Sequence, residues 1–174
     1  MLKTTANKIT LLRIAMIPIF LVLAYLELRW VALAVFIIAS LTDLLDGYIA
    51  RHCHQITNFG KFMDPLADKM LVLSAMCFFV EKGQMPGWAL AIVLLREFAV
   101  SGLRLVAAEK NRVIAAAWSG KVKTTCTMVG LCFMMVFGKY EAMNTFVSFV
   151  ILATTVYSGI EYFHKNRDVF RDAD

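Results

Sequence analysis

The sequence contains few charged residues and few prolines. Only 18% of its 174 residues are Asp, Glu, Lys or Arg, and proline occurs three times. By contrast, 60% of the residues are Ala, Val, Ile, Leu, Met, Phe, Trp, Tyr or Cys. Soluble domains are about a quarter charged, and a soluble domain of this length would bury only about 70% of the surface its unfolded chain exposes. The scarcity of charge excludes a disordered chain and predicts a single compact domain, residues 1–174, with the lipid bilayer as its solvent.

Cysteines are also few, and none of them forms a CxxC pair. The four are Cys53, Cys77, Cys126 and Cys132, and three of them lie inside apolar stretches. This pattern predicts thiols in the core, not a disulfide framework or a zinc site. The net charge of +5 would suggest a nucleic-acid partner in a soluble protein. In this apolar chain it indicates basic loops that face anionic membrane lipids, and no nucleic acid is expected.

Long uninterrupted apolar runs are rare. A charge-free run long enough to span a bilayer occurs once, at residues 142–160. The other apolar runs stop early at a charged residue, so helices that continue past these charges give six spans. The predicted spans are residues 8–27, 30–51, 60–81, 85–108, 117–138 and 142–164. Their short connections are typical of a helical bundle, because backbone in lipid must satisfy its own hydrogen bonds. The predicted fold is an all-α, multi-pass membrane protein with six transmembrane helices.

Lys and Arg are distributed unevenly between the two ends of these spans. With the N-terminus inside, eleven lie at the cytoplasmic ends and three at the opposite ends. The eleven are Lys3, Lys8, Arg51, Lys61, Lys110, Arg112, Lys121, Lys123, Lys165, Arg167 and Arg171, and the three are Arg29, Lys82 and Lys139. Cytoplasmic loops carry an excess of Lys and Arg, so both termini are predicted to be cytoplasmic.

Four aspartates interrupt the second and third predicted spans near their cytoplasmic ends. Asp43 and Asp46 are three residues apart, and Asp64 and Asp68 are four apart. These spacings place each pair on one face of a helix. A carboxylate within a span costs about 2.5–3.5 kcal/mol even on the mildest scale, so it needs a partner or a function. Salt bridges to nearby Lys and Arg are the structural alternative.

Four adjacent carboxylates would repel one another unless cations neutralise them. Oxygen ligands suit hard cations, so the cluster predicts two divalent ions, Mg²⁺ or Mn²⁺, which could hold a pyrophosphate. Gly47, Ala50 and Gly60 leave room beside these carboxylates, and Arg51 could pair with a phosphate. Close helix packing explains the same small residues.

The pattern from Asp43 to Asp68 resembles a known family signature. The stretch DLLDGYIAR, followed by Gly60, Asp64 and Asp68, is similar to the complete signature of the CDP-alcohol phosphatidyltransferase family. The resemblance implies a six-helix, homodimeric membrane enzyme of the bacterial inner (cell) membrane, with its active site open to the cytoplasm. It also implies that Asp68 is a general base and that the four aspartates bind two divalent ions. The implied CDP-binding residues are Gly47, Ala50, Arg51, Gly60 and, from a weaker pattern, Asn7 and Thr10 together with Arg13. In isolation these last three would instead suggest a helix cap and an arginine that extends to the membrane surface.

Basic residues of the fourth and fifth spans point to the acceptor alcohol. The strings REFAVSGLR and WSGKVKT are similar to the branch of this family that transfers the phosphatidyl group of CDP-diacylglycerol to sn-glycerol-3-phosphate. Arg96 and Arg104 are eight residues apart and lie on nearly one helical face, and cations there would suit an anionic acceptor. The predicted acceptor-phosphate residues are Lys61, Arg96, Arg104, Arg112, Lys121 and Lys123. A structural ion-pair network with Glu97 is the alternative.

Two other functions are compatible with parts of the pattern. A related enzyme could use inositol phosphate, serine or another alcohol as acceptor, because the family shares its donor and varies the acceptor. A small ion-coupled transporter would also carry acids within its spans. Transporters place such sites near the membrane midplane, in broken helices or repeats, whereas these acids lie towards one end and no repeat is visible.

Overall fold

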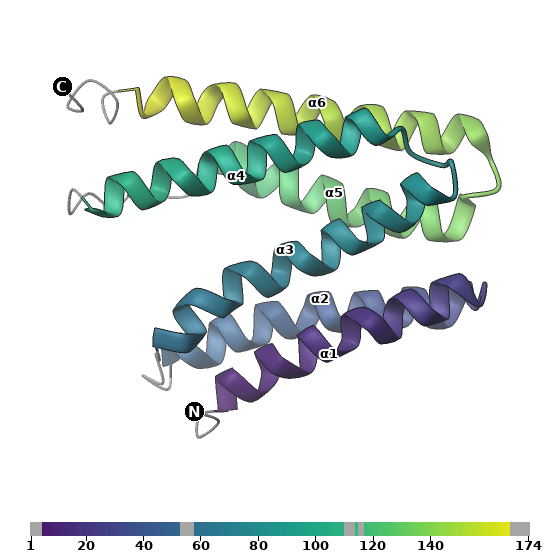
Figure 1. The fold of residues 1–174 in the computed structure, drawn as a ribbon, viewed down its shortest axis with the longest axis horizontal. Coiled ribbons are helices and arrows are strands. Elements are labelled where there is room, and N and C mark those ends of the chain that lie inside the picture. The colour runs from purple at the N-terminus through teal and green to yellow at the C-terminus, as the bar shows by residue number, and fades with distance from the viewer. Residues whose placement is uncertain (1–4, 53–57, 110–113, 115–116, 168–174) are drawn as a thin grey trace. The chain divides into compact units, whose positions relative to one another are not determined.

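The computed structural model describes the backbone of residues 5–52, 58–109, 114 and 117–167, and the side chains within these ranges except those of residues 5–10, 43–52, 58–65, 68 and 109. Over this part of the chain the fold is all-helical, as predicted (Figure 1). Six helices occur: α1 Thr5–Tyr25, α2 Arg29–His52, α3 Asn58–Glu81, α4 Gly87–Glu109, α5 Trp118–Phe137 and α6 Glu141–Lys165. Every predicted helix boundary lies within three residues of the observed one. The chain divides into two compact units, residues 1–81 and 82–174.

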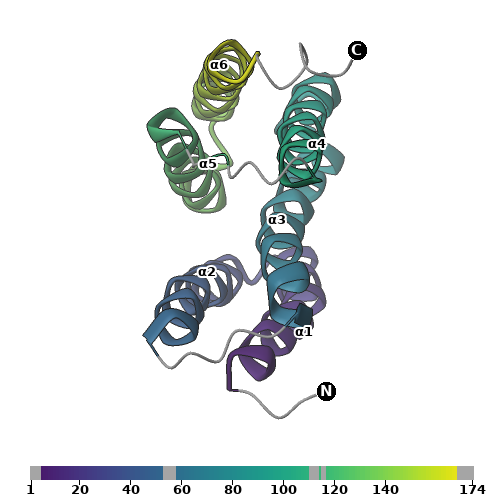
Figure 2. The same ribbon diagram turned by 90° about the vertical axis from the view of Figure 1, so that its left-hand side faces the viewer.

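In the first unit, α1 packs against both α2 and α3 (Figures 1 and 2). Small residues allow the close approach, because Ala32 and Ala39 on α2 and Ala75 on α3 are all buried. The rings of Phe20 and Phe36 fill the α1–α2 contact, with centroids 5.6 Å apart. This unit therefore packs the two helices that carry the four aspartates, α2 and α3, against one common helix.

The turn between α1 and α2 is closed without a glycine. Glu27 adopts a left-handed backbone with φ of 59°, a conformation that usually selects glycine after a helix. The N–H of Leu28 donates to the carbonyl of Leu23, which closes the end of α1. Nearby, the Tyr25 hydroxyl donates to Glu81, so the same end of α1 is linked to the end of α3.

In the second unit, α6 packs against both α4 and α5. A Cβ placed on Gly130 of α5 would lie 2.9 Å from Cγ1 of Val147 and 3.4 Å from Cδ1 of Ile151, both on α6. The glycine therefore sets the short distance between these two helices. At the end of α5, the carbonyl of Gly138 accepts hydrogen bonds from Gln84 Nε2 at 3.1 Å and Asn144 Nδ2 at 2.9 Å, which join the two loops of this unit.

Two helices, α5 and α6, are long and apolar enough to cross a membrane. Shorter apolar stretches occur at Leu11–Tyr25 and Arg29–Thr42. Large apolar side chains also cover outward faces, for example Leu95, Phe98 and Leu105 on α4, each about 70% exposed. Faces of this kind are unusual in water and suit a lipid surround.

The cysteines differ in part from the prediction. Cys77, Cys126 and Cys132 are free thiols, as expected. The prediction of a core position is wrong for Cys77, which is exposed, and Cys126 and Cys132 are only half-buried. The reason is that the outer helix faces are apolar too, so an apolar neighbourhood in the sequence does not identify the core. Cys53 lies outside the described residues.

Candidate active site

The four predicted metal ligands lie on two consecutive helices. Asp43 and Asp46 belong to the last turns of α2, and Asp64 and Asp68 to the first turns of α3. The backbone is α-helical at all four positions, so the spacings of three and four place each pair on one face of its helix. The connection between these helices is short, residues 53–57. Gly47, Ala50, Arg51 and Gly60 belong to the same helical segments.

The side chains of these signature residues lie outside the described part of the structure, so their predicted contacts stay predictions. Among the side chains that are described, no group of three or more His, Cys, Asp or Glu could hold a metal ion. The donor set of the signature fits a divalent cation, because four carboxylates supply only oxygen ligands and enough negative charge for two ions. The aspartates are therefore the candidate metal ligands of this chain.

Arg13 is the described member of the weaker N-terminal pattern. Only 1% of this residue is exposed, although it lies on a helix rich in apolar side chains. The interpretation of Arg13 as an arginine that extends to the surface is therefore wrong, since its side chain is buried within the first unit. Asn7 and Thr10 lie in α1, and their side chains are outside the described residues.

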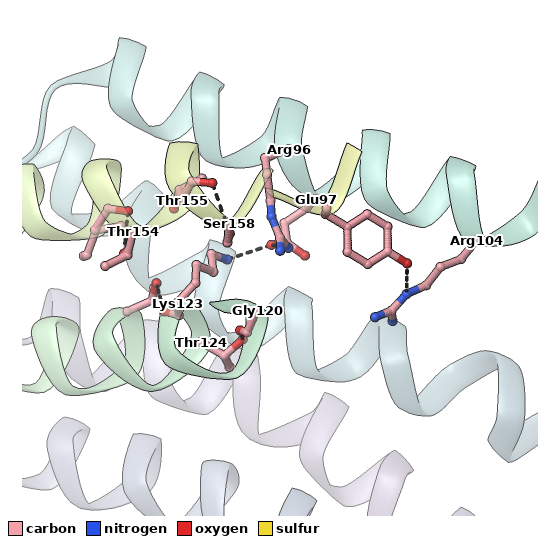
Figure 3. Close-up of polar contacts among 12 residues, drawn as sticks. Arg96, Glu97, Arg104, Gly120, Lys123, Thr124, Thr154, Thr155 and Ser158 are labelled. Atoms are coloured by element: carbon pink, nitrogen blue, oxygen red, sulfur yellow. Dashed lines mark hydrogen bonds and ion pairs between the residues drawn. The ribbon is translucent and has the colours of Figure 1, made fainter. Parts of the chain in front are cut away.

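A buried ion cluster joins α4 to α5. Oε1 of Glu97 lies 2.6 Å from Nζ of Lys123 and 3.0 Å from Nη1 of Arg96 (Figure 3). The three side chains are only 6–13% exposed. Two cations therefore share one carboxylate oxygen in a largely buried position. Two predicted acceptor residues, Arg96 and Lys123, thus contact the same carboxylate, that of Glu97.

Two glycines lie beside Arg96, and one of them, Gly159, makes room for it. A Cβ on Gly159 of α6 would lie 3.3 Å from Cγ of Arg96, and a Cβ on Gly120 of α5 would lie 3.6 Å from its Nη2. The stem of the arginine therefore passes over α6, and its head lies beside α5. Sequence reasoning missed Gly159, because a lone glycine in an apolar helix carries no signal of what packs on it.

Arg104 lies apart from this cluster and has a different partner. Its Nε donates to the hydroxyl of Tyr162 on α6 at 2.9 Å, and its Cζ lies 5.5 Å from the centre of the Tyr162 ring. Tyr162 is 2% exposed, whereas Arg104 is exposed. In Figure 3 the dashed line at Arg104 marks this hydrogen bond. Tyr162 was not among the predicted site residues, since nothing in the sequence links a tyrosine to a residue 58 positions earlier.

The other predicted acceptor residues are Lys121, Lys61 and Arg112. Lys121 is exposed on the first turns of α5, with its Nζ 5.7 Å from the centre of the Trp118 ring. This distance is typical of a cation–π contact. Lys61 and Arg112 fall outside the described side chains. Four of the predicted acceptor residues thus have described side chains. Arg96 and Lys123 are largely buried against Glu97, whereas Arg104 and Lys121 are exposed.

Comparison with known proteins adds a second kind of evidence. The family model for CDP-alcohol phosphatidyltransferase matches residues 3–159. The chain is 39% identical to the CDP-diacylglycerol–glycerol-3-phosphate 3-phosphatidyltransferase of Bacillus subtilis, over 97% of each chain. It is 36% identical to the enzyme of the same name in Escherichia coli K12, over 91% of this chain and 92% of that one. It is also 36% identical to a probable phosphatidylglycerophosphate synthase of Mycobacterium tuberculosis, over 90% and 78%.

Proposed function

Because the chain belongs to the CDP-alcohol phosphatidyltransferase family, we propose that it transfers the phosphatidyl group of CDP-diacylglycerol to sn-glycerol-3-phosphate. The products are phosphatidylglycerophosphate and CMP, which places the reaction in the synthesis of anionic phospholipids. The observation that carries this proposal is similarity over nearly the whole chain to enzymes whose names state this donor and acceptor. The family expected from the sequence is confirmed, and the names of the relatives agree with the expected acceptor.

Enzymes of this family depend on divalent metal ions. In our proposal Asp43, Asp46, Asp64 and Asp68 hold two such ions, Mg²⁺ or Mn²⁺. When bound, the ions supply positive charge that offsets the negative charge of the pyrophosphate and of the leaving CMP. Gly47, Ala50, Arg51, Gly60, Asn7 and Thr10 surround the CDP moiety in this proposal.

The chain itself supplies the base. Asp68 accepts the proton of the C1 hydroxyl of glycerol-3-phosphate while that oxygen forms a bond to the β-phosphorus of the donor. The bond between this phosphorus and the bridging oxygen breaks, and CMP leaves with the electron pair. A positioned general base contributes about 10²–10⁴-fold to a rate, so Asp68 is the side chain on which turnover should depend most strongly.

Basic side chains recognise the acceptor phosphate in this proposal. Arg104 and Lys121 are exposed and can donate charge-assisted hydrogen bonds to phosphate oxygens, and Lys61 and Arg112 are expected to join them. The contacts of Arg96 and Lys123 to Glu97 support a different division of work for this pair. They hold α4 and α5 together, and their positive charges attract the anionic acceptor.

We further propose that all six helices cross the bacterial cell membrane and that the enzyme acts as a homodimer. Both termini and the active site then lie on the cytoplasmic side, and residues 1–174 form one domain of the family. The spans of α5 and α6 and the excess of Lys and Arg at one set of helix ends support this topology. Labelling of single introduced cysteines in intact cells tests it, with the native cysteines replaced.

An acceptor assay tests the function directly. The purified full chain in detergent receives CDP-diacylglycerol, Mg²⁺ or Mn²⁺, and radiolabelled glycerol-3-phosphate, serine or inositol phosphate in separate reactions. We expect lipid product and stoichiometric CMP with glycerol-3-phosphate alone. Turnover of serine or inositol phosphate, with none of glycerol-3-phosphate, would overturn the proposal. Asp68→Asn should lower turnover about a hundredfold or more, whereas Glu141→Gln, an exposed carboxylate on α6, serves as the matched control.

A further inference from the structure

Tyr162 is a buried tyrosine whose polar end meets an exposed arginine. Its ring packs in an apolar cluster with Val100, Leu103 and Ala107 of α4, and only 2% of the residue is exposed. A buried tyrosine hydroxyl needs a hydrogen-bond partner. Here the partner is Nε of Arg104, at 2.9 Å. The apolar packing fixes the ring, so the hydroxyl is held at a fixed point beside α4.

The contact uses only one edge of the guanidinium. Arginine has five N–H donors in a planar fork, and the terminal pair matches two oxygens of a phosphate or carboxylate. Because Tyr162 takes the hydrogen on Nε, the donors of Nη1 and Nη2 stay available. Within the described residues no carboxylate forms an ion pair with Arg104, unlike Arg96 and Lys123, which both contact Glu97.

The ring adds a second constraint on the same arginine. Cζ of Arg104 lies 5.5 Å from the centre of the Tyr162 ring, within the range of a cation–π contact. An exposed arginine otherwise samples many rotamers, and fixing a side chain of this kind on binding costs affinity. Contacts that fix it beforehand reduce that cost. Tyr162 therefore preorganises Arg104 without occupying the donors that an anion needs.

We infer that Tyr162 is a positioning residue for the acceptor. Its hydroxyl and ring hold the guanidinium of Arg104 so that the two terminal nitrogens face the phosphate of glycerol-3-phosphate. This inference rests on the proposed function, because it takes the acceptor from there. Tyr162 itself touches neither substrate nor metal. Its contribution should therefore appear in the binding of the acceptor and not in the binding of the lipid donor.

Steady-state kinetics of Tyr162→Phe tests this inference, since the change keeps the ring and removes the hydroxyl. We expect the KM for glycerol-3-phosphate to rise about five- to tenfold, the effect of losing one typical intramolecular hydrogen bond. The KM for CDP-diacylglycerol and the thermal midpoint should stay close to those of the unmodified protein. Tyr157→Phe is the matched control, because Tyr157 lies on the same helix and is 67% exposed.

A double-variant cycle separates positioning from a general effect on the fold. Arg104→Met removes every donor of the arginine, so the hydroxyl then has nothing to hold. Adding Tyr162→Phe to Arg104→Met should change the KM for glycerol-3-phosphate less than twofold. The same fold-change in both backgrounds would overturn the inference, as would equal changes in the two KM values. A large loss of thermal stability in Tyr162→Phe would assign the hydroxyl to stability and would overturn it as well.

Failure of this inference can be told from failure of the proposed function. The unmodified protein is assayed first with CDP-diacylglycerol and glycerol-3-phosphate. Absence of turnover there contradicts the function, and the inference about Tyr162 fails with it. Normal turnover with an unchanged KM in Tyr162→Phe contradicts only the positioning role.

Discussion

Lys123 on α5 and Glu97 on α4 form an ion pair in which Nζ and Oε1 lie 2.6 Å apart, and the side chains are 6% and 13% exposed. The same carboxylate oxygen accepts a hydrogen bond from Arg96. Since α4 and α5 are otherwise each packed on α6, this pair is a direct polar link between them. The pair also explains why an acid, Glu97, lies beside an arginine in the middle of α4.

Removing the carboxylate should destabilise the second unit. Glu97→Gln removes the carboxylate charge that Arg96 and Lys123 share, and breaking a buried pair in this way costs about 3–5 kcal/mol. A clear fall in the thermal midpoint in detergent is expected. Lys165→Met is the control, because Lys165 is 62% exposed and pairs with Glu161 at the end of α6, where such pairs contribute at most about 1 kcal/mol. Equal midpoints for the two variants would contradict a stabilising role for the buried pair.

An alanine should destabilise the protein at Gly130, in the α5–α6 contact, but not at Gly102 on α4. Gly130→Ala would place a Cβ 2.9 Å from Cγ1 of Val147, a stiff β-branched side chain that cannot move aside easily. Overpacking of this kind costs about 1–3 kcal/mol. Gly102→Ala on α4 meets nothing within 4 Å, so it should gain up to about 1 kcal/mol of helix propensity. The thermal midpoint should therefore fall in Gly130→Ala and rise in Gly102→Ala. A higher midpoint in Gly130→Ala would show that α5 and α6 can move apart at no cost.

Much of the fold could be predicted because the relevant signals are local. The apolar runs, extended past the charges that interrupt them, predict where each helix begins and ends, and the observed boundaries lie within three residues of these predictions. The turn at Glu27 could not be predicted, because its φ of 59° is typical of glycine and no glycine is present. The exposure of Cys77 was missed because large apolar side chains also lie on exposed helix faces, so an apolar neighbourhood in the sequence does not identify the buried face.

The candidate site was predicted unevenly. The four aspartates stay a prediction from their spacing and signature, which single them out because carboxylates within apolar helices are costly and therefore informative. The basic residues were harder, because charge alone does not say which cation is buried. Only the structure separates Lys123, which contacts Glu97, from Lys121, which does not, and only the structure links Tyr162 to Arg104.

Metal removal should abolish turnover reversibly. Treatment with a chelator is expected to stop CMP release, and Mg²⁺ or Mn²⁺ should restore it, because the four aspartates repel one another and the pyrophosphate without cations. Asp64→Asn removes one ligand charge and should raise the metal concentration for half-maximal activity about tenfold or more. Glu141→Gln should leave this concentration unchanged. Activity that persists after complete chelation would contradict the metal site.

Lys121 and Lys123 have the same chemistry and lie two residues apart, yet the structure predicts opposite phenotypes for them. Lys121 is exposed, with its Nζ over the Trp118 ring, so it can contact the acceptor phosphate without supporting the fold. Lys121→Gln should raise the KM for glycerol-3-phosphate about tenfold, the size of one charge-assisted hydrogen bond, with an unchanged thermal midpoint. Lys123→Gln removes the buried partner of Glu97 and should lower the midpoint by several degrees, roughly 2–8 °C for each kcal/mol lost.

Kinetics and thermal unfolding measured on the same preparations of these two variants decide between the assignments. Trp118→Leu is a useful addition, because it removes the ring beside Lys121 and keeps the charge, so a smaller rise in the same KM is expected. A lower midpoint in Lys121→Gln would contradict its role as a phosphate ligand that does not support the fold. An unchanged midpoint with a raised KM in Lys123→Gln would contradict the structural role of Lys123. Lys123 would then be the phosphate ligand, and its contact with Glu97 would be one that the acceptor displaces.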